Sequence, residues 1–280
     1  MFAELKHTLG RMRGQMIGWG IGLALYGLVM ISFYDSIAGM ENFQQFMEAY
    51  PEEMQSFFKS MTELNTPKGY LDTYYFSYMT LIIAILPISA GAGLLVSDEE
   101  RGILDLVLAH PVSRTALFCG RLLGLVAALV LVLAVSWLSW VIPSGSTGLT
   151  LSWIEFLRPF LPLFAVLLLF GTLALLLSML LPSGRIAGMI SGALLVADFL
   201  LLGLSHSSQE LQPIVKFTPL YYYQGGDAIT GLNWGWLGGL LVASALFALL
   251  AWLLFRRRDI RVGGERSWRL PSLRAVLGRS

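Results

Sequence analysis

Six stretches of predominantly apolar residues constrain this chain of 280 residues more than any other feature of its sequence. About 20 apolar residues in an α-helix, at roughly 1.5 Å of rise per residue, cross the hydrocarbon core of a bilayer. Charged residues make up only 13% of the chain, about half the share typical of soluble domains. The sequence therefore predicts an all-α integral membrane protein with six transmembrane helices. The predicted spans are Met16–Tyr34, Tyr74–Val96, Ala116–Ile142, Phe156–Leu181, Ile186–Leu204 and Trp234–Phe255.

The residues before the first span, 1–15, have the pattern of an amphipathic helix. Apolar side chains recur there at alternating steps of three and four, at Phe2, Leu5, Leu9, Met12 and Met16. A basic amphipathic helix beside a span is expected to lie in the membrane interface. Basic residues before an apolar stretch also suit a signal peptide, but no small-x-small cleavage site follows closely. We therefore expect an interfacial helix followed by a retained first span.

The distribution of lysine and arginine predicts the orientation of the spans. With both termini on the same side, fifteen of the 19 basic residues lie on that side, including eight in the basic tail 256–280. The opposite side keeps Lys59, Lys68, Arg158 and Lys216. Because cytoplasmic loops carry the excess of positive charge, both termini are expected in the cytoplasm. The expected location is a plasma membrane, bacterial inner or cell membrane, crossed in multiple passes.

Two connections between spans have distinctive sequences. Only residues 182–185, Pro-Ser-Gly-Arg, separate the fourth and fifth spans, so these helices should form an antiparallel hairpin. The connection between the first two spans, residues 35–72, holds seven acidic residues and two lysines, with apolar residues at helical spacing. We interpret it as an insertion of two amphipathic helices on the outer surface. Its role is either to cap the bundle or to contact substrate or an external partner.

The loop between the second and third spans, residues 97–115, has the pattern of a short cytoplasmic helix. Ser97 and Glu100 have the spacing of a capping box, and Asp98 and Glu99 favour a helix N-terminus electrostatically. Apolar residues follow, and Pro111 ends the helix. An acidic head and an apolar body suit a groove in a partner protein, although the same helix could rest on lipid.

This loop resembles the corresponding loop of type-2 ABC-transporter permeases. The resemblance is carried by Glu100-Arg101-Gly102-Ile103-Leu104-Asp105-Leu106-Val107-Leu108 and by Pro111-Val112-Ser113-Arg114. The family pattern reads roughly Glu-x-Gly-Thr-Leu, an apolar run and Pro-Val-Ser-Arg, so Ile103 departs from it. The end of the sixth span, Phe255-Arg256-Arg257-Arg258-Asp259, is similar to the aromatic-Arg-Arg-Asp run that closes the family's last span. The resemblance covers nearly the whole chain.

The resemblance implies a permease subunit, most often of an exporter, that works with a separate ATPase. Two copies of a cytoplasmic ATPase subunit would bind ATP and Mg²⁺, and a second permease copy or a paralogue would complete the membrane unit. The loop would act as a coupling helix docked in a cleft of the ATPase, and Gly102, which has no side chain, would permit close approach. The residues carried over to this contact are Asp98, Glu99, Glu100, Arg101, Gly102, Leu104, Asp105 and Leu108.

The sequence offers no catalytic apparatus of its own. No G-x-x-x-x-G-K-[ST] motif occurs, so this chain has no phosphate-binding loop of that type. Cys119 is its single cysteine, which excludes an internal disulfide and a multi-cysteine metal site. We therefore expect no enzyme activity, catalytic residue, metal site or bound cofactor in this chain, and no nucleic-acid partner.

Two alternatives to an ATP-driven permease rest on polar residues in and near the spans. Asp198 is the only acid deep within a span and favours an ion- or proton-coupled carrier, or a place on a substrate path. Ser191 and His206 are the candidates for an intramembrane hydrolase, but fifteen residues of helix separate them by about 22 Å. Outside the fifth span, Tyr221, Tyr222 and Tyr223 suit an aromatic belt or an outer gate.

Overall fold

The computed structural model describes residues 1–39, 63–100, 102, 113–206 and 208–257, and every regular element in these ranges is a helix. Six helices are long and apolar enough to cross a membrane. They are α1 (Phe2–Ala38), the composite helix Pro67–Gly93, α8 (Arg114–Ser144), α9 (Trp153–Leu180), α10 (Gly184–Ser205) and α12 (Trp234–Arg257). The prediction of an all-α integral membrane protein with six spans is confirmed.

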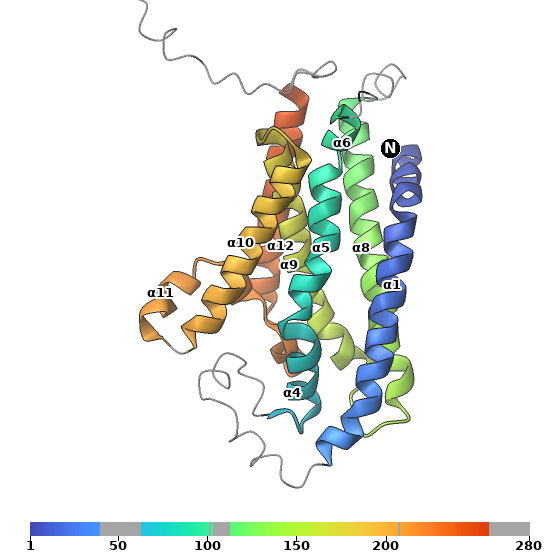
Figure 1. Ribbon diagram of the computed structural model, residues 1–280, viewed down its shortest axis with the longest axis vertical. Helices are drawn as coiled ribbons and strands as arrows, with labels where there is room; N and C mark the ends of the chain where they lie inside the picture. The colour runs from blue at the N-terminus through green and yellow to red at the C-terminus, as the bar shows by residue number, and fades with distance from the viewer. Residues whose placement is uncertain (40–62, 101, 103–112, 207, 258–280) are drawn as a thin grey trace, which may run out of the picture.

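The six helices form one upright bundle with two different ends (Figure 1). The N-terminus of the chain, the short helix α6 (Val96–Glu100) and the C-terminal end of α12 lie at one end, named the α6 end here. The helices α4 (Pro67–Leu71) and α11 (Gln212–Val215) lie toward the opposite end, named the α11 end here. Helix α9 is innermost, because 72% of its most apolar stretch is buried, against 22% for α1 and for α12. The peripheral helices keep apolar side chains such as Leu25 and Val242 on their exposed faces, as contact with lipid requires.

Helix α1 is continuous from Phe2 to Ala38 and packs along α8. Small residues bring the two helices together: a Cβ on Gly27 would lie 2.2 Å from Ser139 Oγ, and one on Gly124 would lie 2.7 Å from Thr8 Cβ. Residues 1–15 are helical, as the sequence predicted, and continue into the first span without a break. Thr8 in this part of α1 is buried in the contact with α8.

The second span is a composite helix that begins seven residues before the predicted Tyr74. It consists of α4 (Pro67–Leu71), a π-helical segment η2 (Asp72–Ser77) and α5 (Met79–Gly93). The side chain of Thr66 caps its first turn by accepting a hydrogen bond from the Gly69 N–H at 3.1 Å. The predicted outer insertion, residues 35–72, is therefore shorter than expected at both ends. Residues 40–62, which hold most of its predicted helices, lie outside the described ranges.

The fourth and fifth spans are joined by a tight connection, and the fifth and sixth by a folded segment at the α11 end. Helix α9 ends at Leu180 and α10 begins at Gly184, which confirms the predicted tight hairpin. After α10, the 3-10 helix η3 (Gln209–Leu211) and α11 form a small projection. The 3-10 helices η4 (Pro219–Tyr222) and η5 (Gly225–Ile229) then return the chain to α12.

Candidate functional site

The most concentrated set of buried charges among the described residues lies at the α6 end of the bundle. Asp98 of α6 binds two arginines at once. Its Oδ1 accepts a hydrogen bond from Arg11 of α1 at 2.8 Å, and its Oδ2 accepts one from Arg121 of α8 at 2.5 Å. The side chains of Asp98 and Arg121 are each only 3% exposed, whereas that of Arg11 is 35% exposed. A single carboxylate thus connects the start of the loop to two spans.

Arg121 is the centre of this network. Besides its bond to Asp98, its guanidinium donates to the backbone carbonyl of Leu94 at 2.8 Å, and its Nε lies 3.8 Å from a carboxylate oxygen of Glu4. The two acids and two arginines of the network balance to zero charge. A charge can remain buried only when it is paired and hydrogen-bonded in this way. The network therefore fixes α6 against α1 and α8.

The predicted capping box at Ser97 is wrong. Helix α6 begins at Val96, so Ser97 lies inside it, where its hydroxyl donates to the carbonyl of Gly93 and accepts from Arg11, both at 2.5 Å. Glu100, the expected partner of Ser97, reaches a different helix. Its Oε1 accepts the backbone N–H of Gly184, the first residue of α10, at 3.0 Å. Ser97 bonds to the Arg11 guanidinium and Glu100 to the start of α10, and these bonds replace the local cap.

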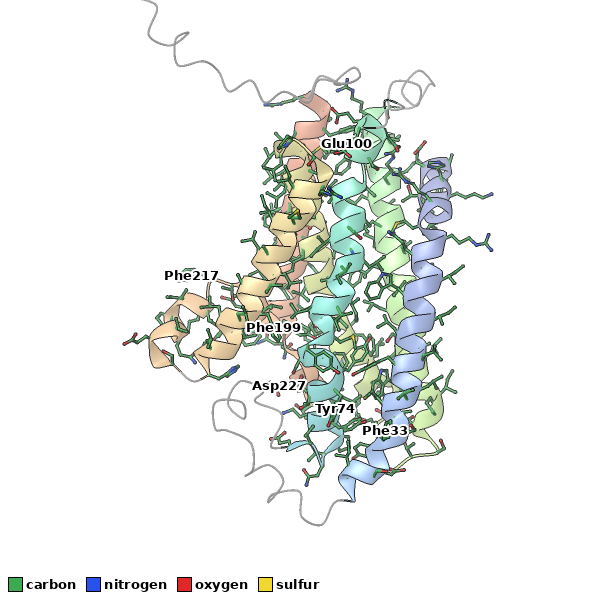
Figure 2. The ribbon with its side chains drawn as sticks, in the orientation of Figure 1. Phe33, Tyr74, Glu100, Phe199, Phe217 and Asp227 are labelled. Atoms are coloured by element: carbon green, nitrogen blue, oxygen red, sulfur yellow. The ribbon has the colours of Figure 1, made fainter. Side chains whose placement is uncertain are left out.

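The bond from Glu100 connects the loop to the α9–α10 hairpin. The carboxylate lies at the N-terminus of α10, where unpaired N–H groups and the helix dipole favour a negative charge. Gly184 permits the approach of the second span, since a Cβ there would lie 2.8 Å from the carbonyl oxygen of Ala92. Figure 2 shows Glu100 at the same end of the bundle as the N-terminus of α1. The start of the loop, residues 97–100, is thus attached to four spans: α1, α5, α8 and α10.

The remaining residues predicted to contact an ATPase are only partly described. Gly102 has a backbone φ of +68°, a left-handed conformation that glycine adopts without strain. Among the described residues, a Cβ there would meet nothing within 4 Å, so the turn geometry accounts for the glycine within this chain, and the close approach to an ATPase stays a prediction. Glu99 is partly buried. Arg101, Leu104, Asp105 and Leu108 lie outside the described residues.

At the α11 end, Asp198 of α10 binds the segment that carries η4. Its Oδ2 accepts the N–H of Leu220 at 3.0 Å, at the start of η4, while its Oδ1 is buried without a hydrogen-bond partner among the described residues. Two tyrosines of this segment are also held by hydrogen bonds. The hydroxyl of Tyr222 donates to the carbonyl of Lys216 at 2.8 Å, and that of Tyr223 donates to the carbonyl of Phe76 at 3.0 Å.

The geometry does not support the intramembrane hydrolase. The hydroxyl of Ser191 is buried and donates to the carbonyl of Phe170 at 3.1 Å. Helix α10 is unbroken from Ser191 to Ser205, so His206 at its end is about 22 Å away along the axis. A serine nucleophile needs its base within hydrogen-bond reach.

Three residues are prominent in this structure that the sequence does not single out. Arg11 and Arg121 contribute to the sequence prediction only through the count of basic residues, and Asp72 only as one acid of the predicted insertion. A signal was present for Arg121, because an ionisable residue within an apolar helix marks a functional position by default. No comparable signal marks Arg11 or Asp72, whose partners lie 87 and 154 residues away.

Comparison with known families assigns the chain to one of them. The family model described as ABC-2 family transporter protein matches residues 11–260. This range covers the six predicted spans and the whole loop after the second span. A search of curated proteins finds no match to the chain. With a family match over most of its length and six membrane-spanning helices, the chain belongs to the ABC-2 family of transporter proteins and is a membrane permease component of an ABC transporter.

Proposed function

We propose that this chain is the membrane subunit of an exporter in which a separate cytoplasmic ATPase drives the movement of the spans. Residues 97–115 dock on the ATPase, and two ATPase copies bind the ATP and Mg²⁺. The network of Asp98, Arg11 and Arg121 is the observation that carries this proposal. A force applied to the loop acts directly on α1 and α8, because the buried ion pairs join them to α6.

The bond between Glu100 and Gly184 supports a second path for the same movement. Displacement of the loop would pull on the N-terminus of α10, one of the more peripheral spans, with 28% of its most apolar stretch buried. Peripheral helices separate from a bundle with less loss of packing than the central α9. In this proposal the outward movement of α10 opens the cargo path.

The membrane unit is proposed to contain a second copy of this chain or a paralogue. Two apolar grooves flank α5, one of about 620 Å³ against α10 and one of about 640 Å³ against α1. Leu81 and Ile85 line the first groove, and Trp19 and Ile82 line the second. Such a surface is suited to helix packing within a bilayer.

The proposed topology places the α6 end in the cytoplasm, on the basis of the charge count of fifteen to four. In a Cys119→Ser background, we expect a membrane-impermeant maleimide to label Glu210→Cys on intact cells. Arg185→Cys should react only after the membrane is permeabilised. Both positions are exposed, so accessibility from the solvent is not limiting. Labelling of position 185 but not of position 210 on intact cells would invert the topology.

The coupling role is tested by co-purification of the ATPase with loop variants. Glu100→Arg removes the acceptor for the Gly184 N–H and reverses the charge at the docking surface, and we expect at least a tenfold loss of bound ATPase. Leu104→Asp, outside the described residues, should act similarly by placing a charge in an apolar contact. Glu100→Gln keeps an acceptor oxygen and should retain most of the bound ATPase. Membrane insertion should be unchanged, since it depends on the apolar spans.

The matched control is Glu210→Arg, the same charge reversal at an exposed site of η3 at the α11 end. It should leave the complex intact. Equal amounts of bound ATPase in Glu100→Arg, Leu104→Asp and the control would show that the loop does not dock. The isolated wild-type chain should also hydrolyse no ATP without its partner, because it has no phosphate-binding loop.

A further inference from the structure

The projection that follows α10 carries the most exposed large apolar side chain among the described residues. Phe217 is 90% exposed, and Ile214 of α11 is 52% exposed. The Phe217 N–H donates to the Ile214 carbonyl at 3.0 Å, so these residues, named the apolar pair here, lie one turn apart on the same side. Figure 2 labels Phe217 on this projection, which stands out to the side of the bundle. Large apolar side chains gathered on a surface mark a contact site.

The fold holds the apolar pair in this exposed position. The side-chain amide of Gln212 donates to the carbonyl of Ser205, the last residue of α10, at 2.7 Å. The hydroxyl of Tyr222 donates to the carbonyl of Lys216 at 2.8 Å. Val215, which follows Ile214 directly, is only 1% exposed, so the opposite side of α11 packs inward. The projection is therefore attached on one side and presents the apolar pair on the other.

The backbone of the projection is paired within the chain where the apolar pair lies. The N–H and the hydroxyl of Thr218 both donate to the carbonyl of Val215 at 2.9 Å. With the bonds described above, the carbonyls of Ser205, Ile214, Val215 and Lys216 all accept hydrogen bonds. Backbone groups in contact with hydrocarbon must be paired in this way. This part of the chain can therefore contact lipid without leaving these groups unsatisfied.

The lengths of the neighbouring spans place the projection at a membrane boundary. Helices α10 and α12 have 22 and 24 residues, about 33 and 36 Å of helix, against a hydrocarbon core of about 30 Å. Helix α12 begins at the exposed Trp234 and has Arg256 and Arg257 in its last turn. Tryptophan is enriched at membrane interfaces, so Trp234 marks the boundary at the α11 end. Because α10 just spans the core, Ser205 lies at the same boundary, and the projection follows it.

The surroundings of the projection are those of an interfacial segment. The last two turns of α10 expose Leu200 and Leu204, which face lipid. The projection itself also carries the exposed polar side chains of Glu210, Gln212 and Lys216. A segment that combines an apolar side with polar side chains lies in the plane of the membrane interface.

We propose that the projection is a membrane anchor, in which Ile214 and Phe217 insert among the acyl chains of the leaflet at the α11 end. The polar side chains of the projection stay at the level of the phospholipid headgroups. Neither Ile214 nor Phe217 lines the two grooves that are proposed for a second permease copy. Lipid is therefore the partner that the depth and the apolar surroundings of the pair favour. Only the identification of this leaflet as the outer one rests on the proposed topology.

The anchor is tested by electron paramagnetic resonance on the full-length chain in phosphatidylcholine nanodiscs. A nitroxide label is attached to Ile214→Cys or to Phe217→Cys in the Cys119→Ser background. Power saturation compares the access of oxygen, which is enriched in lipid, with that of a water-soluble nickel chelate. We expect oxygen to dominate at both positions, as at the control Val242→Cys on the exposed face of α12. Glu210→Cys, on the same projection, should show the reverse.

Two results would overturn the proposal. Access of the nickel chelate at positions 214 and 217 equal to that at position 210 would place the apolar pair in water. Low access of both reagents would show that protein covers the pair, as in a contact with a second copy. The measurement needs no ATPase, so either result would leave the proposed coupling intact.

A pair of substitutions tests whether Phe217 itself holds the anchor in the leaflet. With the label at position 214, Phe217→Glu should raise the access of the nickel chelate several-fold, because a carboxylate is costly to place among acyl chains. Phe217→Leu keeps an apolar side chain and should leave the access nearly unchanged. Equal access in the two variants would contradict the role of Phe217.

Discussion

Asp98→Leu should be among the most damaging single substitutions in this chain. It leaves the guanidinium of Arg121, 3% exposed, with only the Leu94 carbonyl and the more distant Glu4 as partners. Removing one partner of a buried ion pair costs about 3–5 kcal/mol, because the other charge stays buried without compensation. We expect a large fall in the temperature at which the detergent-solubilised protein loses its monodisperse peak in size-exclusion chromatography.

Graded variants separate the buried pair from the exposed one. Arg121→Met should cost less than Asp98→Leu, because Asp98 keeps its bond to Arg11. Arg11→Met should cost about 1 kcal/mol or less, because Arg11 is about one-third exposed and can reach water. The double variant Asp98→Leu/Arg121→Met should recover much of the stability, since apolar replacement of a buried pair is often neutral. Equal losses in all three single variants would show that the network does not act as a buried ion pair.

The double variant also separates stability from coupling. If the ion pairs transmit the movement of the loop to α8, the recovered protein should still bind the ATPase but show little cargo-stimulated hydrolysis. An apolar contact of similar volume restores packing without the directional bonds of a guanidinium. Wild-type stimulation in this stable double variant would assign the network to folding alone.

Gly91→Ala should separate the two helices at the centre of the bundle. Its Cβ would lie 2.1 Å from the carbonyl oxygen of Gly171, a backbone atom of the innermost helix α9. No rotamer change relieves a clash with backbone, so α5 and α9 must move apart. Overpacking of this kind costs about 1–3 kcal/mol or more. We expect a lower thermal transition and a lower yield of monodisperse protein.

Gly239→Ala is the matched control within α12. A Cβ on Gly239 would meet nothing within 4 Å among the described residues. Alanine is favoured over glycine in a helix interior by roughly 1 kcal/mol, so this variant should be neutral or slightly more stable. Alanine at position 91 gains the same helix propensity, so the cost of the clash must exceed this gain for the protein to be destabilised. Equal thermal transitions for the two variants would show that the α5–α9 crossing is looser than this structure indicates.

The sequence by itself determined the features that depend on apolar length and on local turn chemistry. Six apolar stretches determined six spans, because a helix is the form in which a single segment satisfies its own backbone hydrogen bonds in lipid. The Pro-Ser-Gly-Arg connection determined the hairpin of α9 and α10. The motif after the second span indicated the family that the comparison then confirmed.

Only the tertiary structure decided where the polar side chains bind. Asp72 was expected outside the membrane helix, but a glycine N–H 154 residues away allows it to lie inside the composite second span. Ser97 was expected to cap a helix with Glu100, but Arg11 and Gly184 bind these two side chains instead. Each of these bonds joins segments distant in sequence, and a hydrogen bond to a charged group contributes more than a local cap. Local patterns therefore predicted the helices, and long-range hydrogen bonds of charged and polar side chains decided their contacts.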